Sequence, residues 1–259
     1  YWAWTDMWGS KLRMPKEGGL YYDWVKYPLP EVTVEAVDEY RWPEFETAEN
    51  LAAIRDAAIA LRRDTDYALV GSATLGGGIF EQACRIAGME TFMMAMVTDR
   101  RAAERLLDGI TDFYVEVAQR HLDQVGAFLD VYQYADDLAT QETWMISPES
   151  YVTLIKPRQR RLFDAIKSKT EAKLFYHGCG AVFDLVPHLI EIGVDILNPV
   201  QVSARGMDSK RLKAAYGKDI VFWGGGVDTQ HVLPFGSPDN VRTEVTRRIS
   251  DFSPEGGYV

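Results

Sequence analysis

Short apolar runs alternate with amphipathic stretches over most of the chain. The runs typical of buried strands cover residues 67–70, 128–131, 173–176, 194–197 and 220–223. A further strand begins at Gly257. Most runs are followed by residues that are apolar at three- and four-residue spacing, which is the period of a helix. Because strands that are apolar on both faces and joined by helices belong to parallel sheets, the pattern predicts an α/β fold.

The number of strands bears on the architecture. About six are found here, whereas a closed (β/α)8 TIM barrel has eight. The chain opens on Tyr1 rather than on methionine and stops at Val259, where a strand is only beginning, so we expect a barrel truncated at both ends. The alternative is an open doubly wound sheet, although no G-x-G-x-x-G follows a first strand. We expect a single barrel domain over residues 1–259.

The segments between the strands have recognisable limits. The expected helices cover residues 46–63, 101–125, 148–166, 183–193, 208–216 and 238–249. Ser147-Pro148-Glu149 is typical of a helix start, with serine as the N-cap and proline in the first turn. A glycine-rich loop over 76–78 leads into another helix. Residues 1–46 are rich in aromatic residues without a sustained period, so we expect an irregular segment packed on the barrel.

Composition argues against several classes of partner. Of the 259 residues 47% are hydrophobic, and the formal net charge is −10. The sequence has no run of lysine and arginine residues that could bind a phosphate backbone, so no nucleic acid partner is expected. No apolar stretch approaches the roughly 20 residues of a membrane span, and no signal peptide opens the chain. Two cysteines cannot build a disulfide framework, which indicates a reducing cytoplasm.

Polar side chains gather where the predicted strands end. In α/β barrels, ligands and catalytic groups lie at that face. The strand ends here carry Gly71, Ser72, Asp136, Asp137, His177, Cys179, Asn198, Gln201, Trp223 and Asp228. The turns that lead from helices back to strands carry mostly glycine, lysine and aspartate. This asymmetry favours an enzyme with its site at one mouth of the barrel.

An imidazole and a thiol follow the central strand, in the order His177-Gly178-Cys179-Gly180. The glycines let the backbone turn tightly enough for both side chains to face one point, and both are zinc ligands in proteins. The alternative is a buried small residue beside a turn histidine. The other cysteine, Cys84, lies well along a predicted helix, where a thiol more commonly packs as a small hydrophobe.

The remaining strand-end residues each have a functional and a structural interpretation. Asp136 and Asp137 are adjacent, so they cannot both point into the barrel. We expect one to position or deprotonate a substrate, and the other to cap a turn or to be solvated. Gln141 and Gln201 are candidate hydrogen-bond donors to a ligand. Asp228 either lines the site or caps the following helix.

Other residues are candidate members of the same mouth. The glycines over 224–226 either cradle an anion with their N–H groups or simply permit a tight turn. His231 follows the Asp228 turn and can line the mouth, whereas Arg205 is either an anion partner or a solvated loop residue. Glu81 is a weaker candidate.

Several stretches resemble the uroporphyrinogen decarboxylase superfamily, in particular its corrinoid-linked methyltransferase branch. They are "YHGCGAVFDLVPHLIEIGVDILNPVQ" at 176–201, "FWGGGVDTQHVLPFGSP" at 222–238, "YADDLATQETWMISPESY" at 134–151 and the closing "GGYV". The resemblance covers roughly residues 60–259. It implies an α/β barrel with its site at the carboxyl ends of the strands.

The two branches of that superfamily imply different chemistry. The methyltransferases bind zinc through His-x-Cys and a later cysteine; His177 and Cys179 match the first two ligands, and the third is expected beyond Val259. In these enzymes the methyl group is bound to the cobalt of a corrinoid, and the corrinoid is normally held by a separate small protein. The alternative is a metal-free uroporphyrinogen decarboxylase. In such an enzyme, arginines near the N-terminus bind the substrate carboxylates, and an aspartate accepts hydrogen bonds from the pyrrole N–H groups. No matching arginine-rich segment is present.

The favoured hypothesis is therefore a zinc-dependent methyltransferase that moves a methyl group between a corrinoid and a thiol or a small methylated or methoxylated compound. The candidate metal ligands are His177 and Cys179. The candidate catalytic residues are Asp136, Asp137 and Gln201. The candidate substrate-binding residues are Gln141, Asn198, Trp223 and Asp228.

Overall fold

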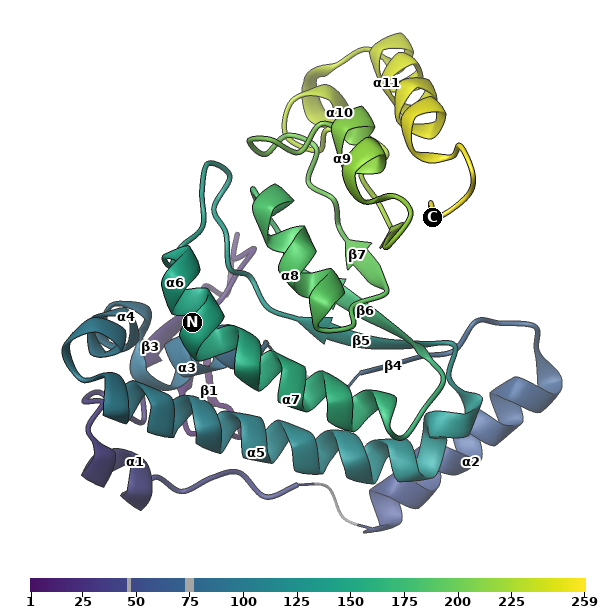
Figure 1. The fold of residues 1–259 in the computed structure, drawn as a ribbon. Helices are drawn as coiled ribbons and strands as arrows, with labels where there is room; N and C mark the ends of the chain where they lie inside the picture. The colour runs from purple at the N-terminus through teal and green to yellow at the C-terminus, as the bar shows by residue number, and fades with distance from the viewer. Residues whose placement is uncertain (46–47, 73–76) are drawn as a thin grey trace.

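The computed structural model describes residues 1–45, 48–72 and 77–259 (Figure 1). Its central element is a five-stranded parallel sheet in the order β4-β5-β6-β7-β8. The strands are β4 (Val70–Ser72), β5 (Val131–Ala135), β6 (Lys173–His177), β7 (Ile196–Asn198) and β8 (Val221–Phe222). Tyr258 adds an isolated parallel bridge to Phe222, near the strand expected at Gly257.

The strand order decides between the two predicted architectures. Each strand pairs with the next one along the chain, as around a (β/α) barrel, whereas a doubly wound sheet reverses direction at a switch point. The predicted barrel-type α/β fold is therefore confirmed, and the doubly wound alternative is wrong. Within the described residues, this sheet has five strands, and β4 and β8 lie at its two edges.

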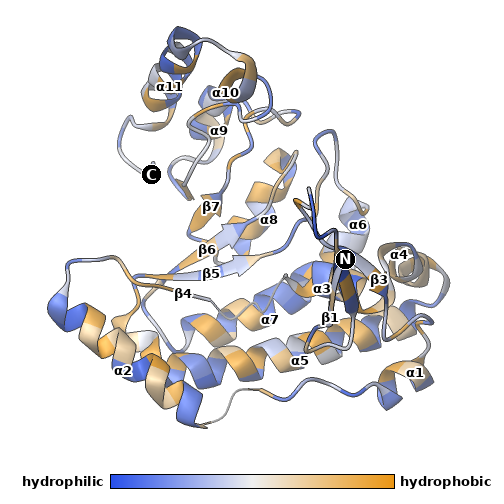
Figure 2. Cartoon of the chain, turned by 180° about the vertical axis from the view of Figure 1, so that it is seen from behind, coloured by the Kyte–Doolittle hydropathy of each residue, from blue (hydrophilic) through white to orange (hydrophobic). Residues whose placement is uncertain are grey.

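Helices connect the strands and cover one face of the sheet. Their bounds are α2 (Ala48–Asp64), α3 (Ile79–Ala87), α4 (Met89–Thr98), α5 (Arg100–Val125), α6 (Pro148–Ser150), α7 (Lys156–Lys167), α8 (Val186–Glu191), α9 (Ser209–Tyr216), α10 (Val232–Phe235) and α11 (Pro238–Phe252). Long α5 and α7 run side by side along the sheet (Figure 1). Apolar and polar residues alternate around both of them, as Figure 2 shows. None of the helices in the described ranges has the length and apolar character needed to cross a membrane.

The predicted helices are found with small shifts at their ends. Ser147 is the N-cap of α6, as its sequence context indicates, and its hydroxyl accepts from the Ser150 N–H at 3.0 Å. A π-helical segment, Tyr151–Ile155, then joins α6 to α7. Two predicted features, the helix start at Glu46 and the loop residue Gly76, lie outside the described residues.

The two faces of the sheet differ because side chains alternate along a strand. One face is almost fully buried against helices: Tyr134 packs edge-to-face on Phe163 of α7 at 4.9 Å, and Phe222 packs on Phe252 of α11 at 5.1 Å. The opposite face carries Gln133, Ala135, Phe175, His177 and Asn198, all only partly buried. This second face is where the candidate residues lie.

The prediction of an irregular segment over 1–46 is wrong in part. An antiparallel sheet forms from β1 (Trp2–Thr5), β2 (Lys11–Met14) and β3 (Asp23–Lys26), and α1 (Val34–Glu39) follows. These strands have four residues each and are largely exposed, so their side chains show little of the apolar alternation that marks a strand. The segment is fastened to α3, because Ser10 donates to the Arg85 carbonyl at 2.9 Å and the Leu29 N–H to the Ile86 carbonyl at 3.1 Å.

Candidate functional site

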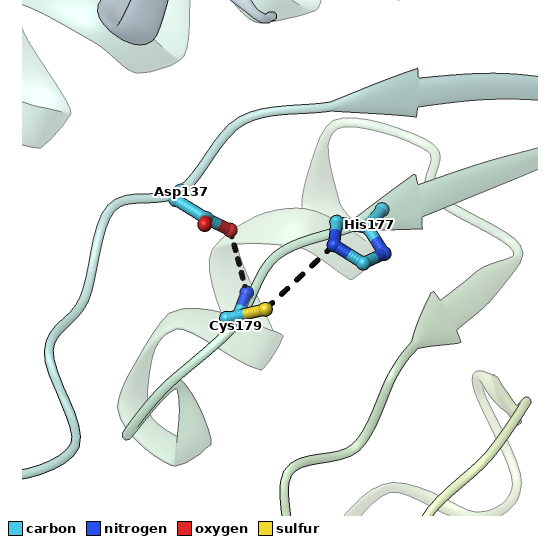
Figure 3. A group of neighbouring side chains, drawn as sticks. All are labelled: Asp137, His177 and Cys179. Carbon is cyan, nitrogen blue, oxygen red and sulfur yellow. Dashed lines mark hydrogen bonds between the residues drawn. The ribbon is translucent and has the colours of Figure 1, made fainter. Parts of the chain in front are cut away.

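Three side chains with metal-binding atoms converge at the carboxyl edge of the sheet. They are Asp137, His177 and Cys179, which we call the ligand group, and their ligand atoms all lie within 4.8 Å of one another. The Sγ atom of Cys179 is 3.7 Å from the Nε2 atom of His177, and the Cys179 N–H donates to the Asp137 carboxylate at 2.7 Å (Figure 3). A sulfur, a nitrogen and an oxygen donor at one point are a set that zinc accepts in proteins.

Strand pairing explains why these residues meet. His177 is the last residue of β6, and Asp137 lies two residues beyond the end of β5, the strand paired with β6. The carboxyl ends of neighbouring parallel strands lie at the same edge of a sheet. The Asp136 N–H donates to the His177 carbonyl at 2.9 Å, which continues the ladder one step past β5 and keeps the two loops together.

A chain of hydrogen bonds orients the His177 ring. The Asn198 amide nitrogen donates to the Trp223 carbonyl at 2.9 Å, which leaves the Asn198 Oδ1 atom facing His177. That oxygen is 2.6 Å from the His177 Nδ1 atom, and since it can only accept, Nδ1 carries the proton. The unprotonated Nε2 atom then faces Cys179. Metal-binding histidines are held in this way by an acceptor on their other nitrogen.

The turn that carries Cys179 is held from both sides. The Gly180 N–H donates to the Gln201 side-chain oxygen at 2.8 Å, and the Ala181 N–H donates to the Thr140 carbonyl at 2.8 Å. Gly180 has a φ of +93°, and an added Cβ atom would lie 2.4 Å from the Thr140 carbonyl oxygen. Only glycine fits this position, so the glycine after Cys179 is required by geometry.

The two adjacent aspartates have different surroundings. The Asp136 carboxylate is fully buried and accepts from the N–H groups of Phe80 and Glu81 at the start of α3, at 3.2 and 3.0 Å. It also accepts from the Tyr134 hydroxyl at 2.8 Å and from the Gln159 amide at 3.2 Å. Asp136 therefore holds α3 against β5, whereas Asp137 belongs to the ligand group, where its carboxylate accepts from the Cys179 N–H.

Burial and charge change the acidity of several groups around the site. Burial raises the pKa of Asp136 to about 6, although the hydrogen bonds from α3, Tyr134 and Gln159 lower it. Burial also raises the pKa of Glu81 to about 7, with a contribution from Asp136. Burial, followed by the charge of Asp137, raises the pKa of the Cys179 thiol to about 11. A cation bound beside Cys179 would act in the opposite direction and favour the thiolate form.

Other predicted residues take structural positions. Gln201 holds the Gly180 N–H, and Asn198 orients His177, so both support the ligand group. The Trp223 ring packs edge-to-face on Phe175 at 5.5 Å. The Gln141 side chain is exposed, and its carbonyl accepts from the Arg205 N–H at 2.8 Å.

Asp228 caps its own turn. Its carboxylate accepts from the N–H groups of Gln230 and His231 at 2.8 and 3.0 Å, and it lies 3.0 Å from the His231 Nδ1 atom. Burial works against ionisation, but these hydrogen bonds outweigh it, and the pKa of Asp228 is lowered. These contacts occupy the Asp228 carboxylate within the turn that precedes α10, whose N-cap residue is His231.

Sequence reasoning did not identify Asp137 as a companion of the metal ligands, since the third ligand was expected beyond Val259. The available signal was the pairing of consecutive strands, which puts the end of β5 beside the end of β6.

Cys84 is buried in α3, as predicted. His188 lies 3.0 Å from the Lys156 Nζ atom.

Two cavities reach the ligand group. One, of about 440 Å³, is lined by Asp137 together with Glu81, Arg85 and apolar side chains that include Trp24 and Met145. The other, of about 460 Å³, is lined by Cys179 and by the loops that follow β7 and β8. Each cavity can admit a small molecule to the same cluster of donor atoms.

Comparison with known proteins agrees with the fold. The family model described as uroporphyrinogen decarboxylase (URO-D) matches residues 5–259. None of the curated proteins matches the chain. Among solved structures, the chain is similar to a methyltransferase from Methanosarcina mazei, with a TM-score of 0.66 and 17% sequence identity. The similarity covers 95% of this chain and 67% of the other.

Proposed function

The chain belongs to the uroporphyrinogen decarboxylase family, and from this premise we propose that it is a zinc-dependent methyltransferase. The methyl group moves between a corrinoid cobalt and a thiol or a small methylated or methoxylated substrate. The observation that carries the proposal is the convergence of Asp137, His177 and Cys179 at the carboxyl edge of the sheet. The similarity in fold to a methyltransferase supports it.

The ligand group suits zinc in chemistry as well as in position. His177 presents Nε2, because its Nδ1–H donates to Asn198, and Cys179 presents Sγ 3.7 Å away. The Asp137 carboxylate completes three protein donors, which leaves room for a substrate atom as the fourth. When bound, zinc would stabilise Cys179 as a thiolate and make a substrate thiol nucleophilic at neutral pH.

Residues around the group hold it in place and shape the approach of a substrate. Asn198 and Gln201 fix the His177 ring and the Cys179 turn. The Phe175 and Trp223 rings pack edge-to-face on each other on the half-buried face of the sheet. In this proposal, a separate corrinoid-carrying protein docks at the same mouth, and the enzyme works in a reducing cytoplasm, consistent with two free cysteines.

Metal analysis tests the first half of the proposal. The protein is purified with zinc, dialysed, and analysed by mass spectrometry for bound metal. We expect about one zinc per chain, lost in Cys179→Ala. The second cysteine offers a matched control, because Cys84 is buried in α3 outside the ligand group and Cys84→Ala should keep its zinc.

Turnover tests the second half. Methylcobalamin and a small thiol are incubated with the protein, and loss of the methylcobalamin absorption is followed together with formation of the methyl thioether. We expect turnover by the zinc-loaded protein and none by Cys179→Ala. A metal-free protein that decarboxylates uroporphyrinogen would contradict the proposal and establish the alternative activity.

A further inference from the structure

The cavity beside Asp137 has walls from parts of the chain that are far apart in sequence. One wall belongs to the N-terminal segment and carries Trp24 of β3 and Tyr27. The other walls belong to α3, to Met89 at the start of α4 and to the loop after β5. The volume of about 440 Å³ is within the range of small-molecule sites. Because Asp137 lines the cavity, a molecule bound there can reach the ligand group.

The N-terminal wall is held in place by contacts with the end of α3. The Leu29 N–H donates to the Ile86 carbonyl at 3.1 Å, two residues beyond Tyr27. Gly88, between α3 and α4, has a φ of +89°, and a Cβ atom there would lie 3.2 Å from the Tyr27 ring. Glycine at this position therefore lets the Tyr27 ring pack directly on the backbone. A segment outside the parallel sheet thus supplies a defined wall of this cavity.

The charged side chains on these walls already have partners. The Arg85 guanidinium donates to the Glu81 carboxylate at 3.1 Å, and it lies over the Trp24 ring, 5.1 Å from the ring centroid. The Asp137 carboxylate accepts from the Cys179 N–H and belongs to the ligand group. Among the described residues that line the cavity, Arg85 is the only cationic one. Since both Glu81 and the Trp24 ring engage its charge, these walls do not favour a charged ligand.

Most of the remaining lining is apolar. Trp24, Tyr27 and Phe80 contribute aromatic rings, and Met89 and Met145 contribute thioether side chains. Methionine is flexible enough to fill irregular gaps, and its sulfur makes favourable contacts with aromatic rings. Apolar surface that enters such a cavity leaves water, which favours binding in proportion to the area buried. The walls therefore suit an uncharged ring better than a small polar molecule.

We propose that this cavity binds an uncharged, apolar ring of the substrate while the reacting atom of the same molecule lies at the ligand group. Trp24 is the specificity-determining residue, because its indole forms part of the wall and covers the Arg85 guanidinium. The N-terminal antiparallel sheet thus selects the substrate. This inference rests on the proposed function only for the reacting atom. The ring site itself rests on the cavity and on the partners of its charged groups.

Two methionines on the walls allow binding to be measured directly. Isotope-labelled methionine methyl groups of the zinc-free protein are followed by NMR during titration with benzyl alcohol, and separately with benzoate, which has the same ring and a negative charge. We expect saturable shifts of Met89 and Met145 with benzyl alcohol, and weaker binding of benzoate. Met207, which is buried in the core away from this cavity, should not shift. Shifts that do not saturate, or tighter binding of benzoate, would overturn the ring site.

Variants of Trp24 separate specificity from a merely structural role. In Trp24→Ala we expect benzyl alcohol to bind about 10-fold more weakly, because apolar contact is lost. Benzoate should gain relative to benzyl alcohol, since the Arg85 guanidinium is uncovered. Trp24→Phe should restore the wild-type preference. Trp4→Ala is the matched control, because Trp4 packs on Tyr22 of the same segment without lining the cavity.

Met145→Ala tests the cavity from a different wall and leaves the N-terminal sheet intact. It should also weaken benzyl alcohol binding, by about threefold to 10-fold, with Met89 as the remaining reporter. An unchanged preference in Trp24→Ala, with Met207 in its wild-type position, would remove Trp24 from the specificity role. Unchanged affinity for benzyl alcohol in both variants would remove the ligand from this cavity.

The preference among acceptors links the ring site to turnover. Methyl transfer to phenylmethanethiol is compared with transfer to ethanethiol, which carries the thiol without the ring. We expect a kcat/KM about 10- to 100-fold higher for the thiol with the ring, and a smaller ratio in Trp24→Ala. Zinc-dependent transfer at equal rates to both thiols would overturn this inference and leave the proposed function standing. Saturable shifts of Met89 and Met145 in a protein that neither binds zinc nor turns over would do the reverse.

Discussion

Asp136 and Asp137 are neighbours in the chain, yet one carboxylate lies in the protein interior and the other at the candidate metal site. Asp136 is fully buried, and its oxygen atoms accept four hydrogen bonds from α3, Tyr134 and Gln159. Asp137 is only partly buried and accepts from the Cys179 N–H. The end of β5 thus carries a buried carboxylate and a candidate metal-binding carboxylate side by side, and their surroundings alone distinguish them.

The largest expected effect is on stability, from Asp136→Ala. The variant leaves two α3 N–H groups, the Tyr134 hydroxyl and the Gln159 amide without their acceptor in the interior. We expect the free energy of unfolding to fall by about 3 kcal/mol or more. Urea denaturation followed by circular dichroism measures it. A loss below 1 kcal/mol would show that Asp136 does not hold α3 to the sheet.

Asp137→Ala should show the opposite profile. It removes one acceptor near solvent, so we expect the free energy of unfolding of the zinc-free protein to change by no more than about 1 kcal/mol. Its affinity for zinc should fall at least about 100-fold, because a ligand is lost rather than a supporting residue. Competition with a chelating dye measures the affinity. Undiminished zinc affinity in this variant would remove Asp137 from the ligand group.

A smaller loss of zinc affinity is expected from Asn198→Ala. This residue touches His177 and not the metal position, and it fixes the proton on Nδ1. Removing such a supporting acceptor typically costs 10- to 100-fold in metal affinity, and we expect about 10-fold here. Asn198→Asp keeps an acceptor facing Nδ1 and is the matched control, which should retain most of the affinity. Equal losses in both variants would contradict the orienting role.

Much of the fold was predictable because its strands are apolar on both faces and its helices have clear limits. The His177 and Cys179 pair was predictable for a local reason, since both lie on one glycine-rich turn. The different surroundings of Asp136 and Asp137 were not predictable, because they depend on a long-range contact. The Phe80 N–H at the start of α3, which donates to Asp136, lies 56 residues earlier in the chain. The antiparallel strands over 1–46 were missed because aromatic side chains on exposed strands obscure the alternation.

The last prediction concerns pH and the buried carboxyl group of Asp136. Burial raises the pKa of Asp136 to about 6, well above the usual range of an aspartate. A carboxyl group whose pKa is raised in the folded state stabilises the protein. The stabilisation is complete at pH values below the pKa of that group in the unfolded state, and it is lost as the pH rises through its pKa in the folded state. Between pH 4 and 6, Asp136 should therefore lower the free energy of unfolding with rising pH, by at most about 1.4 kcal/mol per pH unit.

Comparison with Asp136→Asn isolates this contribution from other carboxyl groups. Asp228 and Asp130, whose pKa values are lowered, act in the opposite sense, because their stabilisation is lost as pH falls. They are present in both proteins and cancel in the difference.

The gap in unfolding free energy between wild type and Asp136→Asn should therefore change between pH 4 and 6, in the direction that favours wild type at low pH. A gap that stays constant from pH 4 to 6 for Asp136→Asn would mean that this carboxyl group does not titrate there, and that its hydrogen bonds outweigh its burial.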